Sequence, residues 1–328
     1  MVLLLCFMGN ISLGSVHIPL GQTFQSLIGQ PLENQSFSYI IWSYRLPKAL
    51  TAILVGSGLS VSGLLMQTLF RNPLAGPFVL GISSGASLGA AILIMGSGLV
   101  TGLYLGHLGP DLALALAASL GSFLVLFAVL GVAAKIKDTM ALLIIGLMFG
   151  SITSALVSVL SFFSTSEQLQ RFVFWSYGSL GNLGWGQLSL LFFITVLGML
   201  ISMLSLKSLN AFLLGESYAQ SMGVDLKRTK YMIIMATGLL AGGITAFAGP
   251  IAFIGLAVPH VGRQLFQTTD HKIVLPAVAL CGAIVMLICD GIAQMPGSAS
   301  VLPINAVTSI FGAPVVIWLL VKQQKIIF

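Results

Sequence analysis

Long apolar runs alternate along this chain with short breaks that contain polar residues, proline or glycine. A helix needs ~20 apolar residues to cross a bilayer, and a backbone in lipid must satisfy its hydrogen bonds within its own segment. The runs therefore predict membrane-spanning helices rather than strands. Ten spans are expected, at about residues 1–16, 46–69, 78–98, 111–134, 140–162, 187–206, 230–248, 251–267, 273–293 and 304–322.

Composition supports this pattern, because 57% of the 328 residues are hydrophobic and only 7% are charged. A soluble globular domain carries about 25% charged residues. So much apolar surface must face lipid or other buried helices, which predicts an all-α polytopic membrane protein. The 37 glycines fit this prediction, since small residues let membrane helices approach closely.

The positions of the basic residues predict the orientation in the membrane. If the first span runs outward, three basic residues fall in outer loops and eleven in inner ones. This positive-inside bias places both termini in the cytoplasm, and we attribute the net charge of +6 to orientation rather than to nucleic-acid binding. The outer residues are Arg45, Lys48 and Arg171; the inner ones are Arg71, Lys135, Lys137, Lys207, Lys227, Arg228, Lys230, Arg263, Lys272, Lys322 and Lys325.

The first apolar stretch, Val2 to Leu13, is short for a span. It lacks the basic flank and the small-residue cleavage site of a signal peptide. We therefore expect a first helix whose cytoplasmic start is missing from this sequence.

Two glycine-rich stretches resemble each other within this single transmembrane domain, 1–328. Ser57–Gly63 is similar to Thr237–Gly243, and Ala-Gly-Pro follows each of them. The stretches lie in the second and seventh spans and would have opposite orientations, as in the inverted repeats of transporters. This predicts repeats at about 46–162 and 230–322, although glycine-rich helices also match one another by chance.

Few groups that could carry chemistry lie within the spans. Asp111 begins a helix, Asp290 lies near the outer end of the ninth span, and His260 lies within the eighth. A proton-coupled carrier is expected to hold an acid or histidine at mid-depth in the membrane. The spans of this chain lack such a residue, which argues against a proton-coupled carrier. No histidine or carboxylate lies at helical spacing from His260, so we interpret it as structural, bonded to a carbonyl that the kink at Pro259 frees. No catalytic residues, metal or cofactor are expected on this chain.

The fifth span carries a stripe of hydroxyl groups. Its serines are spaced by three, four and three residues, which places them on one face of a helix. Two interpretations stay open: small residues for helix packing, or a weakly polar wall along which a large solute passes. The serines are Ser151, Ser154, Ser158 and Ser161.

The polar segment 207–230 is the longest polar stretch of the chain, and it lies on the cytoplasmic side by the count of basic residues. The chain lacks the G-x-x-x-x-G-K-[ST] loop that cradles nucleotide phosphates. It is therefore not expected to be an ATP-hydrolysing enzyme, and any energy must come from another subunit.

On the outer side, Arg45, Lys48 and Arg171 are either interfacial anchors or docking sites for an acidic soluble partner.

The chain resembles the ten-helix permease subunits of ATP-driven importers for iron-siderophore complexes, haem and cobalamin. The resemblance runs in the family's order from about residue 40 to the C-terminus. The matching stretches are Arg45–Lys48, Gln67–Ala75, Gly81–Gly85, Leu214–Gly223, Gly249–His260, Asp270–Lys272, Asp290 and Leu302–Pro314.

This resemblance implies a homodimer of permeases in the bacterial cytoplasmic (inner) membrane, with the pathway at the dimer interface. It also implies two cytoplasmic ATPase subunits that bind ATP and Mg²⁺, and a substrate-binding protein that docks outside on Arg45 and Lys48. The segment like 207–230 contacts the ATPase in that family; a plain solvated loop is the alternative. The implied contact residues are Leu214, Gly215, Glu216, Ala219, Gln220 and Gly223.

The chain departs from the family in its outer loops. Gln294 stands where the family often has arginine, and Val301 replaces a usual glutamate. Docking at that second position is therefore doubtful, and Arg171 could substitute for it.

The function expected from the resemblance is import of a large metal chelate by alternating access, with a ferric siderophore first and haem or cobalamin as alternatives. A secondary carrier or a channel not driven by ATP is the alternative class.

Overall fold

The computed structural model describes residues 1–32, 34–96, 109–133, 135–136, 139–295 and 300–323. Within these ranges the protein is helical without a β-strand, and each of the ten predicted spans contains a helix, which confirms the predicted all-α membrane fold. Residues 97–98 and 134, at the ends of two predicted spans, lie outside the described residues. The helices, with η for π- and 3₁₀-helical turns, are α1 (Val2–Ser12), α2 (Leu20–Leu27), α3 (Gln35–Ile40), η1 (Ile41–Arg45), α4 (Leu46–Leu69), η2 (Pro77–Leu80), α5 (Ile82–Met95), α7 (Pro110–Ala133), α8 (Thr139–Phe162), α9 (Ser166–Ser176), α10 (Trp185–Leu204), α11 (Leu206–Leu213), α12 (Glu216–Ser221), α13 (Leu226–Thr237), η3 (Gly238–Gly242), α14 (Gly243–Ala248), α15 (Ile254–Phe266), α16 (His271–Ala293) and α17 (Ile304–Gln323).

Several spans are shorter than the apolar runs that predict them. Helix α1 has 11 residues, α5 has 14 and α15 has 13. Helix α5 begins after a turn at Gly81 (φ +70°), and α15 begins after Phe253 (φ +66°). An apolar run does not reveal such a turn. Six described stretches are long and apolar enough to cross a bilayer: Gln35–Leu69, Pro110–Ala133, Met140–Phe162, Trp185–Leu204, Leu226–Ala248 and His271–Ala293.

Helices α2, α3, α9, α11 and α12 lie outside the predicted spans. The second span is also longer than predicted, because α3, η1 and α4 form one continuous helix of 35 residues. It begins at Gln35 rather than at residue 46, since the side chain of Asn34 accepts a hydrogen bond from the Ser36 N–H at 3.0 Å and caps the helix. The polar residues of its first turns conceal this start in the sequence.

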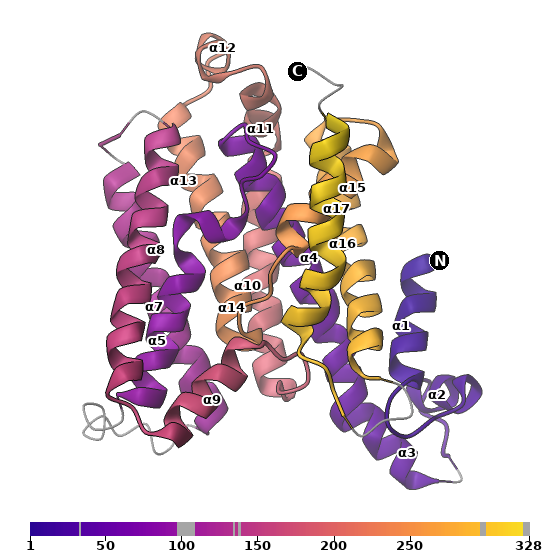
Figure 1. The fold of residues 1–328 in the computed structure, drawn as a ribbon. Coiled ribbons are helices and arrows are strands. Elements are labelled where there is room, and N and C mark those ends of the chain that lie inside the picture. Colours follow the sequence, from indigo (N-terminus) through magenta and orange to yellow (C-terminus); the bar gives the residue numbers. More distant parts are fainter. Residues whose placement is uncertain (33, 97–108, 134, 137–138, 296–299, 324–328) are drawn as a thin grey trace.

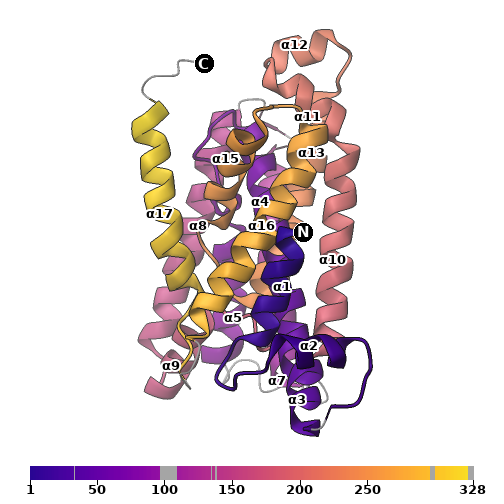
Figure 2. The same ribbon diagram turned by 90° about the vertical axis from the view of Figure 1, so that its right-hand side faces the viewer.

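Helix α4 forms the centre of the bundle and packs against α15 and α16 (Figures 1 and 2). Glycines allow backbone contact along this packing. A Cβ atom at Gly56 would lie 2.2 Å from the carbonyl oxygen of Gly282, and one at Gly63 would lie 1.7 Å from that of Gly255. Of the most apolar stretch of the Gln35–Leu69 helix, 78% is buried, against 17% for α8. Close glycine contacts thus hold the centre, and α8 lies on the outside.

The two halves of the chain pack on each other reciprocally. Whereas α4 of the first half contacts α15 and α16 of the second, η3 and α14 of the second half contact α5 and α7 of the first. Glycines make this second contact too, since Gly238 approaches Leu126 and Gly242 approaches Ser122. In Figure 1 the α13–α14 stretch runs opposite to α4. An inverted repeat would pack in this way, and the repeat itself stays a prediction.

The ends of the bundle agree with the predicted orientation. Helices α11 and α12 lie at one end with the last turn of α17, and α3 and α9 lie at the other (Figure 1). The predicted outer cations belong to η1, α4 and α9, and the polar segment 207–230 covers α11, α12 and the start of α13. Of the predicted inner cations, Lys137 and Lys325 lie outside the described residues. The N-terminus lies part-way along the bundle, and α1 runs from there toward the outer end.

Candidate functional site

Helix α12 projects beyond the bundle at the end that is predicted to face the cytoplasm (Figure 1). Two glycines with positive φ set it apart: Gly215 (φ +107°) precedes it and Gly223 (φ +83°) follows it. Side chains other than glycine rarely adopt these conformations, so the two glycines make the chain reverse direction within a few residues. The result is a short helix held out from the membrane body.

The exposed surface of this projection is apolar as well as polar. Two of the contact residues that the resemblance implies are exposed: Gln220, and Leu214, which is 62% exposed. Ala219 lies on the other face and is fully buried within the chain. Tyr218 (53%) and Met222 (60%) are exposed too, although sequence reasoning missed them. Their spacing of four residues is the signal that could have found them, because it places both on one face of a short helix.

Glu216 connects the projection to the next helix. Its carboxylate lies 3.0 Å from the ammonium group of Lys230 on α13. Both side chains are partly buried, and a cavity of about 630 Å³ lies beside them, lined also by Gln220, Asp225 and Tyr231. This ion pair holds the start of α12 against the membrane helices.

On the outer side, the predicted docking cations bind groups of the chain itself. The Arg45 guanidinium donates hydrogen bonds to the carbonyl oxygens of Ile11 and Ser12, both at 2.8 Å, and to that of Val16. Arg45 therefore ties η1 to the end of α1. It also lines, with Lys48, an outer cavity of about 580 Å³.

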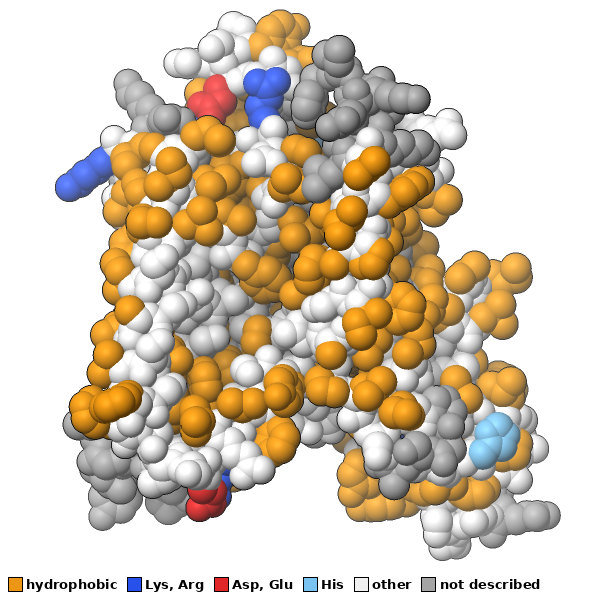
Figure 3. Space-filling view, in the orientation of Figure 1, with side chains coloured by type: hydrophobic (Ala, Val, Ile, Leu, Met, Phe, Trp, Pro, Cys, Tyr) orange, Lys and Arg blue, Asp and Glu red, His pale blue; other side chains and the backbone are white. Residues whose placement is uncertain are grey.

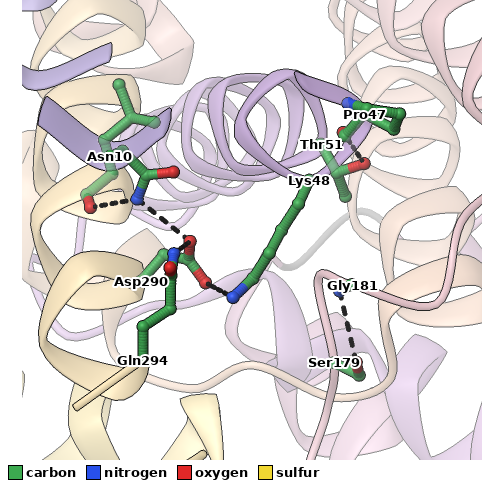
Figure 4. Close-up of polar contacts among 9 residues, drawn as sticks. Asn10, Pro47, Lys48, Thr51, Ser179, Gly181, Asp290 and Gln294 are labelled. Atoms are coloured by element: carbon green, nitrogen blue, oxygen red, sulfur yellow. Dashed lines mark hydrogen bonds and ion pairs between the residues drawn. The ribbon is translucent and has the colours of Figure 1, made fainter. Parts of the chain in front are cut away.

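Lys48 and Asp290 form a buried ion pair between α4 and α16 (Figure 4). The Lys48 Nζ lies 3.1 Å from Asp290 Oδ1, and the two side chains are only 18% and 3% exposed. Asp290 Oδ2 accepts hydrogen bonds from Asn10 on α1 at 3.0 Å and from Gln294 at 2.8 Å. Gln294 stands where the family often has arginine, and it donates a hydrogen bond to this carboxylate. Sequence reasoning missed the pair.

Arg171 lies apart from this cluster, on α9. It forms an ion pair of 2.7 Å with Glu167 one helical turn earlier, and the two side chains are 71% and 73% exposed. The structure thus brings Arg45 and Lys48 to one cavity and leaves Arg171 elsewhere. Val301, the other departure from the family, lines the same cavity as Arg45.

The serine stripe of α8 faces outward. Ser151, Ser154 and Ser158 are exposed, and Ser161 is partly buried. The hydroxyls of Ser151, Ser158 and Ser161 donate to the carbonyl oxygens four residues earlier, at 3.1, 3.0 and 2.9 Å. Ser161 also reaches another helix, since its hydroxyl lies 3.7 Å from the Met95 sulfur on α5. The exposed part of the stripe thus contributes little to packing within the described chain.

His260 is structural, as interpreted, but its partner differs from the expected one. Its Nε2 lies 2.8 Å from the carbonyl oxygen of Pro73, in the loop after α4. A carbonyl accepts, so Nε2 carries the hydrogen. The expectation that the kink at Pro259 would supply the carbonyl was wrong, because the loop after α4 passes close to the ring and supplies it instead.

A family model decides the identity. The model of the FecCD transport family matches residues 2–322. The chain belongs to the FecCD transport family. Relatives of this FecCD chain include the vitamin B12 import system permease protein BtuC of Klebsiella pneumoniae, 41% identical over 286 residues, which are 87% of this chain and 83% of that protein. The corresponding protein of Salmonella typhi is 38% identical over 286 residues, with 87% and 84% covered.

Solved structures agree with the FecCD assignment. A metal-chelate type ABC transporter in an inward-facing conformation has a TM-score of 0.84 and 30% sequence identity, and the match covers 98% of this chain and 96% of that one. PsaBC from Streptococcus pneumoniae in complex with a Fab has a TM-score of 0.56 at 14% identity, with 92% and 95% covered, and this shows the fold alone. The FecCD chain is accordingly a permease of an ABC importer, a transport subunit.

One face of this FecCD permease is recessed between α8 and α17, with apolar side chains on both sides of the recess (Figure 3). Large apolar side chains are exposed along both helices. Exposed patches of this kind mark lipid or protein contacts. They include Ile144, Leu147, Ile152 and Leu156 on α8, and Ile310, Phe311 and Trp318 on α17.

Proposed function

We propose that this chain moves a large metal chelate into the cytoplasm of a bacterium by alternating access, driven by separate ATPase subunits. The observation that carries the proposal is the projecting helix α12, which with its flanking residues presents Leu214, Tyr218 and Met222 to the cytoplasm beyond the membrane body. Exposed apolar side chains on a short helix fit a cleft in a partner. Binding and hydrolysis of ATP with Mg²⁺ would then take place on that partner.

The remaining partners follow from the other surfaces. A second copy of the chain would cover the recessed face between α8 and α17, which places the serine stripe beside the pathway in the bacterial inner membrane. An extracytoplasmic binding protein would dock over the outer cavity, where Arg45 and Lys48 lie. Because both cations already have partners within the chain, docking there relies on carboxylates that compete for them.

The chelate we propose is cobalamin, with a ferric siderophore second. Sequence reasoning placed the siderophore first, but relatives named as vitamin B12 permeases are 38% and 41% identical to this chain. A ferric siderophore or haem remains the choice if a cobalamin assay fails, since a transporter described as metal-chelate type is 30% identical.

Purification from the native membrane in mild detergent tests this function. We expect an ATPase subunit to copurify, and vesicles with the purified complex and its binding protein to import cyanocobalamin only with ATP. A ferric hydroxamate and haemin serve as parallel probes. Uptake driven by an ion gradient without an ATPase would contradict the proposal.

Changes at the two ends of α12 should uncouple transport from ATP hydrolysis. Glu216→Ala removes the ion pair with Lys230. Gly223→Val strains the backbone, because a β-branched residue is forced to positive φ, but its added Cβ atom meets no neighbouring atom within 4 Å. We expect uptake per ATP hydrolysed to fall about tenfold in each, with the permease still folded. Arg228→Ala, on the exposed surface of α13, is the matched control. Normal coupled uptake in both variants would contradict the contact role.

A further inference from the structure

Beneath the projecting helix, one side chain joins three helices. Asn210 lies on α11, and its Oδ1 accepts hydrogen bonds from the backbone N–H and the ring Nδ1 of His271, at 2.9 and 2.7 Å. Its Nδ2 donates to Asp270 Oδ1 at 2.7 Å. The His271 Nε2 in turn lies 2.8 Å from Thr68 Oγ1 on α4. A single amide on α11 thus holds the start of α16 and, through the histidine, the end of α4.

The orientation of this amide is fixed by its partners. A backbone N–H only donates and a carboxylate only accepts, so Oδ1 must face His271 and Nδ2 must face Asp270. Asp270 also caps α16 by accepting the Lys272 N–H at 3.0 Å, and this bond and the Asn210 amide hold the pKa of Asp270 below its usual value. Asp270 therefore stays an acceptor at neutral pH. These contacts are directional, whereas the apolar contacts of α11 could slide.

Helices α4 and α16 form one antiparallel unit that is pinned at both ends. At the cytoplasmic end, Thr68 meets His271, and both side chains are buried. At the outer end, Lys48 meets Asp290. Between these contacts, the backbones touch at Gly56 and Gly282. A displacement at one end is therefore carried to the other rather than absorbed between the helices.

We propose that Asn210 is the positioning residue through which the motion of α11 and α12 reaches the α4–α16 unit and, through it, the outer ion pair. This inference rests on the proposed coupling of α12 to an ATPase. Helix α12 receives the push, and α11 contacts α12 on one side and α4 and α16 on the other. The amide of Asn210 makes the hydrogen bonds between α11 and the start of α16. Within the described chain, no other side chain of α11 forms a hydrogen bond to that helix.

Two variants distinguish the hydrogen bonds of Asn210 from the packing of its side chain. Asn210→Leu keeps the approximate size of the side chain and removes all three hydrogen bonds. The exchange variant, Asn210→Asp combined with Asp270→Asn, keeps a carboxylate opposite an amide. The carboxylate then at position 210 can still accept from both N–H groups of His271. Ser208→Leu is the control, since it makes a similar apolar change on α11 at a partly exposed side chain that has no hydrogen bond within the described residues.

The experiment uses the complete complex with its ATPase and binding protein in vesicles, with cyanocobalamin as the probe. For Asn210→Leu we expect ATPase association to persist and the number of chelates imported per ATP to fall about tenfold. The exchange variant and Ser208→Leu should keep the wild-type ratio. Rescue by exchange is the readout that a loss of packing alone would not produce.

The outcomes are distinct. If the Asn210→Leu complex keeps the wild-type ratio, or if uptake and hydrolysis fall together with the ratio unchanged, the inference is overturned. Failure of the exchange variant to restore the ratio overturns it as well. If the wild-type complex binds no ATPase or imports no chelate with ATP, it is the proposed function that fails.

Discussion

Replacing Gly63 by alanine is expected to destabilise the permease by roughly 3 kcal/mol or more, which is the upper range for overpacking of a core. The added Cβ would lie 1.7 Å from the carbonyl oxygen of Gly255, and its next contacts are also backbone atoms. Backbone cannot rotate away as a side chain can, so α4 and α15 must separate. Thermal unfolding in detergent, followed by gel filtration after heating, measures the effect.

The matched control is Gly131→Ala on α7, where an added Cβ meets nothing within 4 Å. This variant should unfold at the wild-type temperature or slightly above it, because alanine favours the helix. Equal unfolding temperatures for Gly63→Ala and the wild type would show that the α4–α15 contact is looser than the backbone distances imply.

Replacing Lys48 by methionine is expected to cost about 3–5 kcal/mol, because it leaves the carboxylate of Asp290 buried without its cation. The apolar stem of methionine fills much of the space of lysine, so the loss of charge dominates. Combining Lys48→Met with Asp290→Asn should recover part of the loss, since a neutral amide oxygen can still accept from Asn10 and Gln294. The same unfolding assay applies.

Arg171→Met provides the comparison for this prediction. Its ion pair with Glu167 is exposed, and exposed pairs contribute about 0–1 kcal/mol. We expect its unfolding temperature to stay near that of the wild type. A loss for Lys48→Met no larger than that for Arg171→Met would contradict the importance of burial at the outer pair.

The lengths of the apolar runs were sufficient to predict the long apolar helices, because each of them is a run of residues that lipid or other helices must cover. The prediction was weaker where a polar cap or a turn sets the boundary. Asn34 begins its helix among polar residues, and Phe253 turns the chain within an apolar run. Both depend on single backbone conformations that composition does not encode.

The candidate sites also include some that the sequence predicts and some that it does not. The polar segment 207–230 stands out in the sequence because its polar residues are close together along the chain. The pairs that hold it and the outer side together are not local: Asn210 lies 61 residues from His271 along the chain. Sequence places Lys48 and Asp290 at similar depth in the membrane, but whether they face each other depends on how α4 and α16 rotate against one another.

The hydroxyl stripe of α8 has a chemical polarity of its own. Because Ser151 and Ser158 each give their only hydroxyl hydrogen to a carbonyl of their own helix, their oxygens offer lone pairs and no donor to anything beside them. At these two positions the surface attracts amide N–H groups and hydroxyls rather than bare carboxylates or phosphates. If the chelate passes along this face, as we propose, Ser151 and Ser158 can accept hydrogen bonds from it but have no hydrogen left to donate.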